Sequence, residues 1–132
     1  MGRRLILDTN ALIAYERGTI DATALDDDDL AIAAVTVAEY RVGIELAATA
    51  ARAADRSRAL AALTGAVDVL EYTESTAAHH AHLMAHVRTS GRPRSAHYLI
   101  IAAHAAETGR TVVSRDAAAR FDTLPGVLAI SM

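Results

Sequence analysis

The sequence predicts a three-layer α/β/α fold with a mostly parallel sheet of about five strands. The first observation behind this class is that short β-rich runs alternate with longer alanine-rich segments of helical spacing. Such alternation is typical of parallel sheets covered by helices on both faces. The second is an apolar fraction of 52% over 132 residues, with no repeat or linker-like tract. Residues 1–132 are therefore expected to form one α/β domain, without a second unit.

Strands are predicted for apolar runs that are short and bounded by charged or turn residues. The first run, Leu5-Ile6-Leu7, follows two arginines and ends at Asp8. The second follows the acidic block Asp26–Asp29, which we interpret as a solvated turn. In chain order, the predicted strands cover residues 4–7, 30–33, 67–72, 111–114 and 127–130.

Helices are predicted between the strands, where apolar side chains recur at helical spacing among alanines. Glycines at positions 18, 65 and 109 mark the ends of three of them, and the break Gly91-Arg92-Pro93 separates the last two. In chain order, the predicted helices cover residues 9–17, residues from 36 onward, 51–63, 74–89 and 96–107.

Composition limits both the location of the protein and the kind of metal it can bind. No segment approaches the roughly 18 uncharged apolar residues that a membrane span requires, and Asp8 precedes any signal-like apolar region, so we expect a cytoplasmic protein. The absence of cysteine restricts metal ligands to oxygen and imidazole, which favours Mg²⁺ or Mn²⁺. The net charge of −3 argues mildly against a nucleic-acid partner, although all 13 basic residues are arginines, whose planar fork binds phosphate.

Three acidic residues lie at predicted strand-to-helix junctions. Asp8 follows the first strand, Glu39 lies one turn into the next helix, and Asp116 follows the strand at residues 111–114. Structural interpretations exist: Asp8 as a helix N-cap, and Glu39 as part of a capping box that begins at Thr36. Because the carboxyl ends of parallel strands meet at one crevice, the three acids are also expected to lie together.

A shared metal site explains three such acids better than three unrelated caps. Clustered carboxylates repel one another and shift toward protonation unless a cation neutralises them. Mg²⁺ accepts a few carboxylates while it keeps several waters and binds substrate phosphate. The implied reaction is metal-assisted hydrolysis of a phosphodiester by an activated water.

Five segments, in order, resemble the PIN domain and specifically the VapC-type toxins of bacterial toxin–antitoxin pairs. They span nearly the whole chain and are Leu5-Ile6-Leu7-Asp8-Thr9-Asn10, Ala38-Glu39-Tyr40-Arg41-Val42-Gly43, residues 91–103, Val113-Ser114-Arg115-Asp116 and residues 121–127. The resemblance implies a single PIN-like domain and a Mg²⁺-dependent endoribonuclease, with Mn²⁺ as an alternative ion. It also implies neutralisation by a cognate VapB-type antitoxin and a toxin homodimer within a toxin–antitoxin hetero-oligomer.

Residue by residue, three acids of the family pattern are matched by Asp8, Glu39 and Asp116. Thr9 and Asn10 match polar positions after the first acid, where they would orient Asp8 or a water or cap the following helix. Ser114 matches a Ser/Thr position near the site, and its role is open.

Tyr98 departs from the family pattern, which has an aspartate at this position. A phenol with an ordinary pKa of about 10 is neutral at pH 7 and is a poor Mg²⁺ ligand, so we expect an impaired site. His97 is not expected to substitute, because adjacent helical residues point about 100° apart and imidazole suits Mg²⁺ poorly. Either this member lost the acid naturally, or the tyrosine was introduced or selected because the active toxin harms its host. The single-base difference between the codons favours the second explanation.

Basic residues near the break at Gly91 also carry two interpretations. Arg88, Arg92 and Arg94 form a solvated loop or contact phosphate beside the metal site. Four histidines in the preceding helix are interpreted as structural or solvent-facing rather than as a metal cluster; they stand at positions 79, 80, 82 and 86.

Two further functions are weighed against the ribonuclease. A catalytically silent Tyr98 form would act as an antitoxin-binding and co-repressor module, and loss of cleavage on Asp8→Asn would separate the enzyme from this module. A small phosphohydrolase with Asp8 as nucleophile is disfavoured, because such enzymes generally want a second aspartate at the position of Asn10.

Overall fold

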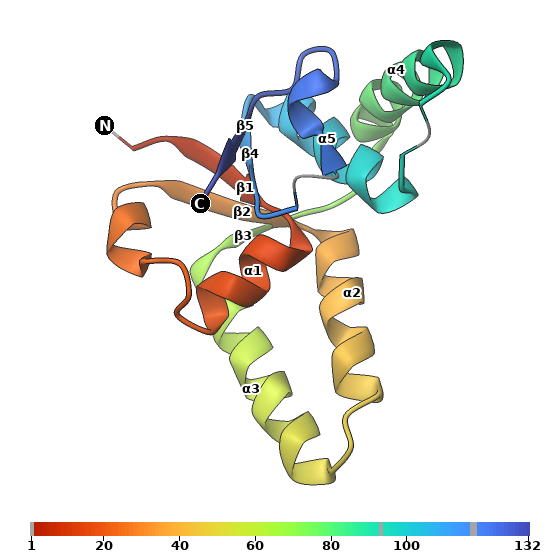
Figure 1. Cartoon of the computed structure of the whole chain (residues 1–132). Coiled ribbons are helices and arrows are strands. Elements are labelled where there is room, and N and C mark those ends of the chain that lie inside the picture. Colours follow the sequence, from red (N-terminus) through yellow and green to blue (C-terminus); the bar gives the residue numbers. More distant parts are fainter. Residues whose placement is uncertain (1, 93, 117–118) are drawn as a thin grey trace.

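The computed structural model describes residues 2–92, 94–116 and 119–132, and its centre is a five-stranded sheet in which all neighbouring strands are parallel (Figure 1). The strand order is β3-β2-β1-β4-β5, so that the first strand lies in the middle. This arrangement confirms the predicted α/β class. The strands are β1 (Arg4–Leu7), β2 (Asp29–Ala33), β3 (Asp68–Leu70), β4 (Thr111–Ser114) and β5 (Ala129–Ser131).

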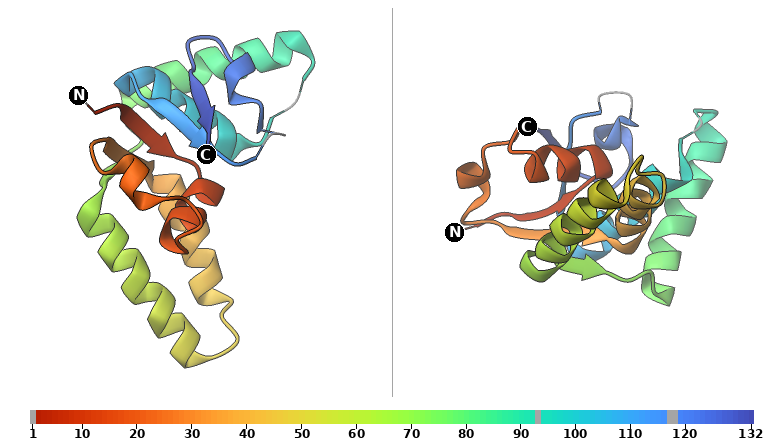
Figure 2. Two further views of the ribbon diagram at one scale, coloured as in Figure 1. Left: turned by 60° about the vertical axis from the view of Figure 1, so that its left-hand side comes forward. Right: turned by 90° about the horizontal axis from the view of Figure 1, so that it is seen from below.

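Helices cover both faces of the sheet. The core on one face is built with α1 and α3, and the core on the other with α4 and α5. The pair α2 and α3 extends away from the sheet as an arm, which is clearest in Figures 1 and 2. The helices are α1 (Thr9–Glu16), α2 (Ala34–Glu45), α3 (Ala50–Ala66), α4 (Glu74–Ser90) and α5 (Ala96–Thr108), with short 3₁₀ helices η1 (Ala22–Leu25) and η3 (Phe121–Thr123).

The central strand β1 shows why the sequence folds this way. Leu5 and Leu7 pack into the core on one face, Ile6 packs into the core on the other, and all three are fully buried. A strand buried on both faces needs a continuous apolar run rather than an alternating one. The run also delivers the next residue, Asp8, to the carboxyl end of the sheet.

The element boundaries differ from the predicted ones mainly near α2. This helix begins at Ala34, directly after β2, and Ala33 takes the N-cap position without a side-chain hydrogen bond. Thr36 is therefore inside the helix and buried, and the predicted capping box is wrong. Its hydroxyl has no hydrogen-bond partner among the described residues, so it does not serve as a cap.

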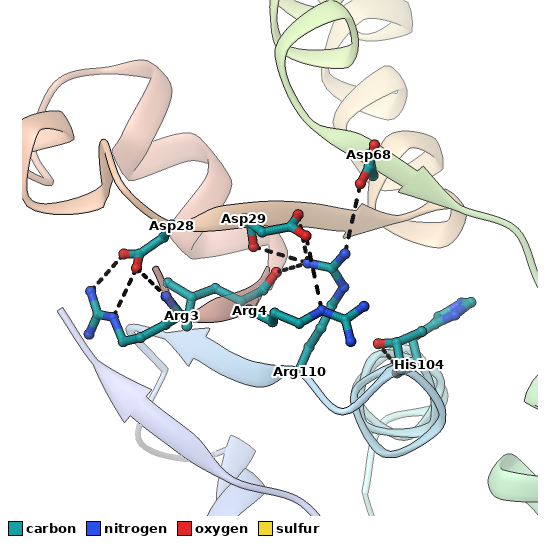
Figure 3. A network of polar contacts seen from close by, with 9 residues as sticks. Arg3, Arg4, Asp28, Asp29, Asp68, His104 and Arg110 are labelled. Atoms are coloured by element: carbon teal, nitrogen blue, oxygen red, sulfur yellow. Dashed lines mark hydrogen bonds and ion pairs between the residues drawn. The ribbon is translucent and has the colours of Figure 1, made fainter. Parts of the chain in front are cut away.

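The amino-terminal edge of the sheet holds a network of paired charges (Figure 3). Arg110 is buried there and donates from Nη1 to the main-chain oxygens of Leu5 and Asp29, at 3.1 and 3.0 Å, and to the Asp29 carboxylate at 3.2 Å. Asp28 accepts hydrogen bonds from Arg3, and its side chain is only 6% exposed. The interpretation of Asp26–Asp29 as a solvated turn is therefore wrong for Asp28 and Asp29, because distant arginines bind them.

None of the helices in the described ranges is both long and apolar enough to cross a membrane.

Candidate functional site

The candidate site lies at the carboxyl ends of β1 and β4, two strands that are neighbours in the sheet. The chain enters β1 first and then adds β2 and β3 on one side, and β4 and β5 on the other. The strand order therefore reverses at β1 and β4, and open α/β sheets bind ligands at such a switch point. Asp8 continues β1, since its backbone N–H donates to the main-chain oxygen of Val113 at 3.1 Å.

Asp8 is both a helix cap and a member of the site. One carboxylate oxygen accepts from the backbone N–H of Ala11 at 2.8 Å, and the other accepts from the hydroxyl of Ser114. The residue is 1% exposed. Burial is the main cause that raises the pKa of Asp8, and the charges of Asp116 and Glu39 raise it further against the opposing effect of the two hydrogen bonds.

Glu39 reaches the same site from α2 and is held by two side chains. Thr9 donates from its hydroxyl to Oε1 at 2.8 Å, and Nδ1 of His97 lies 3.2 Å from Oε2. Thr9 therefore orients Glu39 rather than Asp8. Two neighbouring residues of α5 therefore contact different acids: His97 contacts Glu39 of α2, and Tyr98 contacts Asp116. His97 as a replacement for the missing aspartate stays a separate question, on which the prediction was negative.

Tyr98 lies on the first turn of α5 and points at the acids. Its hydroxyl donates to the carboxylate of Asp116, and its ring meets Phe121 edge to face with centroids 5.6 Å apart. The hydrogen bond to Asp116 is the main cause that raises the pKa of Tyr98 to about 12, and burial and the charges of the three acids act in the same direction. The phenol is therefore neutral at physiological pH.

The three acids share one electrostatic environment, although their side chains do not converge on one point. The pKa of Asp8 responds to both other carboxylates, as does that of Tyr98. Within the described ranges, however, no three His, Asp or Glu side chains are placed so that they could hold a metal ion. Each carboxylate instead accepts from its own hydroxyl: Asp8 from Ser114, Glu39 from Thr9 and Asp116 from Tyr98.

The candidate ligand atoms are of the chemical type that binds hard divalent cations. All the candidate ligands are carboxylate oxygens, which Mg²⁺ and Mn²⁺ prefer. The raised pKa of buried Asp8 is the sign of uncompensated negative charge, which a cation at this point would relieve. The hydrogen bond from Tyr98 competes for one of these oxygens.

The remaining predicted residues lie at the margin of the site. Asn10 is exposed on the first turn of α1, and Arg92 is exposed in the loop before α5. Arg94 is partly buried and donates from Nη2 to the hydroxyl of Thr123 at 2.7 Å. None of the ion pairs found in the described part of the chain joins Arg92 or Arg94 to an acid.

The four histidines of α4 do not form a metal cluster within the part of the chain that the structure describes. His80 lies 2.8 Å from the hydroxyl of Tyr72, and burial lowers its pKa, while His82 and His86 are exposed. These placements agree with the structural and solvent-facing interpretation.

The structure also adds residues that sequence reasoning missed. Arg115 and Arg120 line a cavity of about 250 Å³ that includes Ser114 and Asp116. Arg115 is adjacent to Asp116 in the sequence, which was a usable signal. The position of Arg120 depends on the backbone path after β4, and no local pattern revealed it.

Comparison with known proteins supports this description. A family model for the PIN domain matches residues 5–125. Ribonuclease VapC5 of Mycobacterium tuberculosis is 36% identical over 111 residues, which make up 84% of this chain and 82% of that protein.

Two solved structures are similar over 98% of both chains. VapBC-5 from M. tuberculosis, described as a member of the VapBC family of toxin-antitoxin systems, has a TM-score of 0.81 at 32% identity. VapBC2 from Rickettsia felis, solved bound to a DNA fragment from its promoter, has a TM-score of 0.86 at 16% identity, a likeness of fold alone.

Proposed function

This chain belongs to the PIN-domain family and to its VapC-type members, and from that premise we propose that it is a divalent-metal-dependent endoribonuclease toxin whose activity is impaired by Tyr98. The observation that carries the proposal is the placement of three acids around the switch point of the sheet: Asp8 follows β1, Asp116 follows β4, and Glu39 of α2 accepts a hydrogen bond from Thr9, the residue after Asp8. Folds of this kind bind ligands at such a point, and the charges of Glu39 and Asp116 both raise the pKa of Asp8. The substrate class is RNA, and the bond broken is a phosphodiester.

Asp8, Glu39 and Asp116 would hold the metal, with Mg²⁺ as the expected ion and Mn²⁺ as an alternative. A bound divalent cation supplies charge stabilisation for phosphoryl oxygens and acidifies water, so that hydrolysis proceeds at neutral pH. The protein's part is orientation. Ser114 and Thr9 fix the carboxylates of Asp8 and Glu39 by hydrogen bonds, which keeps the ligand oxygens in place before the metal and RNA arrive.

Tyr98 impairs this arrangement in two ways. Its neutral phenol donates to Asp116 and therefore engages an oxygen that the metal needs. Its ring, packed against Phe121, occupies the place where the family has a short carboxylate. A fourth acid is lost and the third is partly blocked, so weaker metal binding and slow cleavage are expected.

The test is to restore the acid. Tyr98→Asp should raise Mg²⁺-dependent cleavage of a fluorescent RNA at least about tenfold, the effect of roughly 1.4 kcal/mol on the barrier, and adding Asp8→Asn to this revertant should abolish the gain. Tyr98→Phe is the matched control, because it frees Asp116 from the phenol without adding a carboxylate and should restore little. The proposed impairment by Tyr98 is wrong if the revertant cleaves no faster than the Tyr98 protein and inhibits growth no more strongly, and the ribonuclease proposal itself fails if neither protein cleaves RNA.

A second candidate function follows from the bond between Tyr98 and Asp116. If this bond silences the site, the protein would act chiefly as an antitoxin-binding and co-repressor module. The structural relatives are VapBC complexes, and one of them holds promoter DNA, which supports a VapB-type antitoxin as the partner of this chain. A toxin homodimer within the complex is part of the same proposal and is implied by the family resemblance. Antitoxin binding by the Tyr98 protein without any cleavage would favour the module.

A further inference from the structure

A cavity of about 350 Å³ lies between the end of α4, the following loop and η3. His86 and Ser90 line it from α4, Arg92 and Arg94 from the loop, and Thr123 from η3. Among the described residues that line it, none is acidic. In a chain with a net charge of −3, a cavity with two arginines and no such carboxylate is a local concentration of positive charge.

The described residues do not use every hydrogen-bond donor of the Arg94 guanidinium. Nη2 donates to the hydroxyl of Thr123 at 2.7 Å, whereas Nε is buried and has no hydrogen-bond partner among the described residues. The hydroxyl of Thr123 is neutral, so this hydrogen bond leaves the positive charge of Arg94 uncompensated. The planar fork of arginine suits phosphate oxygens in particular.

The cavity is linked to the candidate active site by one short element. Thr123, which binds Arg94, belongs to η3 together with Phe121. Phe121 packs against the ring of Tyr98, and Tyr98 in turn binds Asp116. Arg94 also lies just before α5, the helix that carries Tyr98. An anion held in this cavity is therefore close to the acids without contacting them.

We propose that this cavity binds one backbone phosphate of the RNA, away from the bond that is cut. Arg92 and Arg94 provide the positive charge, and the phosphate accepts hydrogen bonds from their guanidinium groups. The inference rests on the proposed ribonuclease function and deepens it, because it gives the RNA a second point of attachment that fixes its direction across the site. Inorganic phosphate has the same chemistry, and the experiment distinguishes the two sources.

The experiment measures binding of a fluorescein-labelled single-stranded RNA of about 12 nucleotides by anisotropy at several KCl concentrations. All proteins carry Asp8→Asn so that the RNA stays intact. Arg92→Gln combined with Arg94→Gln should weaken binding about tenfold and reduce the slope of log affinity against log salt by about 0.7, the value for one phosphate contact on a single strand. Arg52→Gln is the matched control for the single variant Arg92→Gln, because each removes one positive charge from an exposed position; the Arg52→Gln substitution on α3 should change affinity less than about twofold.

Each outcome decides the question. An equal loss in the Arg52→Gln control would show a general charge effect and overturn the proposal, as would unchanged RNA binding by the cavity variants. If these variants keep RNA affinity but lose binding of inorganic phosphate, measured by ³¹P line broadening, the cavity takes free phosphate and not RNA. Since Arg94→Gln also removes the bond to Thr123, the exposed Arg92→Gln variant alone carries the test if the double variant melts early.

The two proposals fail separately. If Tyr98→Asp cleaves RNA while the cavity variants bind it normally, only the phosphate site is wrong. If the Asp8→Asn protein binds no RNA and the Tyr98→Asp revertant cleaves none, both are wrong.

Discussion

The acidic side chains at the two ends of the sheet have different kinds of partner. At the amino-terminal edge, acids meet arginines: Asp28 binds Arg3 at 2.8 Å, and Asp29 binds Arg110 at 3.2 Å (Figure 3). At the carboxyl-terminal edge, the acids accept hydrogen bonds from hydroxyl groups, and Glu39 also lies 3.2 Å from the imidazole of His97. Ser114 donates to Asp8, whose pKa is nevertheless raised by burial and by neighbouring carboxylates.

This difference separates a stabilising end from a functional one. Paired charges and satisfied main-chain oxygens at the first end hold β1, β2 and β4 together. At the second end, burial of the Asp8 carboxylate raises its pKa and disfavours its charged form, and a buried carboxyl group with a perturbed pKa in such a position is typical of functional sites. Four substitutions test this difference.

The largest effect should come from Asp8→Asn. In the Tyr98→Asp background, cleavage should fall about a thousandfold, because a carboxylate that holds the metal contributes several kcal/mol to transition-state stabilisation. The free energy of unfolding should rise by about 1 kcal/mol at pH 7, since asparagine still caps α1. Single-turnover cleavage and urea denaturation measure the two effects.

The stability gain should depend on pH in a defined direction. The folded-state pKa of Asp8 is above its unfolded value, so protonated Asp8 favours the fold at low pH, and this contribution disappears as pH rises through the folded-state pKa. Asp8→Asn and the parent should therefore be equally stable at low pH, and the variant should become the more stable protein as pH rises. If the Asp8→Asn variant is less stable than the parent at pH 7, the charged Asp8 carboxylate does not destabilise the fold as inferred.

At the other end, Arg110→Ala should lower the free energy of unfolding by about 2 to 4 kcal/mol, because it leaves two main-chain oxygens without their donor and removes a well-buried side chain. Urea denaturation measures the loss. Arg58→Ala on α3, which breaks only an exposed pair with Asp55, is the control. Equal effects of the two substitutions would remove the distinction between the ends.

A smaller effect is expected from His104, which lies beside Arg110 in Figure 3. The residue is 1% exposed, and both ring nitrogens are without hydrogen-bond partners in the described ranges. Burial is the main cause that lowers its pKa, nearby His80 acts in the same direction, and Glu107 opposes them. The unfolded chain therefore binds the proton first, and stability is lost as pH falls below about 6.5 toward the lowered folded-state pKa.

His104→Leu is the variant that checks this. It should flatten the fall of the urea midpoint between about pH 7 and pH 5 while the midpoint at pH 7 stays level or rises. An unchanged acid slope would assign the pH dependence to other groups.

The smallest effect should come from Arg4→Gln. Arg4 lies 4.0 Å from the Asp29 carboxylate, and both side chains are at least half exposed. An exposed pair of this kind contributes at most about 0.5 kcal/mol. A loss in the thermal or urea midpoint as large as that of Arg110→Ala would show that the network acts as a unit rather than through its buried member.

Much of the fold could be predicted because its signals are local. The apolar run at residues 4–7 and the β-branched run at 111–114 coincide with β1 and β4. The start of α2 was missed because the chain passes from β2 into the helix without a capping side chain, so that Thr36 suggested a later start. The roles of Asp28 and Asp29 were missed because their partners, Arg3 and Arg110, are 25 and 81 residues away in sequence.

The candidate site divides in the same way. Asp8, Glu39 and Asp116 could be predicted because strand ends converge, and the structure brings them into one electrostatic environment. The hydroxyl that each acid uses was not predictable, since donor and acceptor come from different elements: Thr9 of α1 binds Glu39 of α2. The contact of His97 with Glu39 was not predictable either, because an angle between neighbours on one helix says nothing about a partner on another helix.

The pairing of β1 with β4 has a consequence for synthesis on the ribosome. Leu5 pairs with Thr111, and the Ser114 hydroxyl that orients Asp8 is 106 residues further along the chain. The middle of the sheet therefore closes only after residues up to Ser114 have left the exit tunnel. A chain interrupted before Asp116 contains Asp8 and Glu39 but lacks the third of the proposed metal ligands, so under the proposed function a product that stalls early would have no complete site.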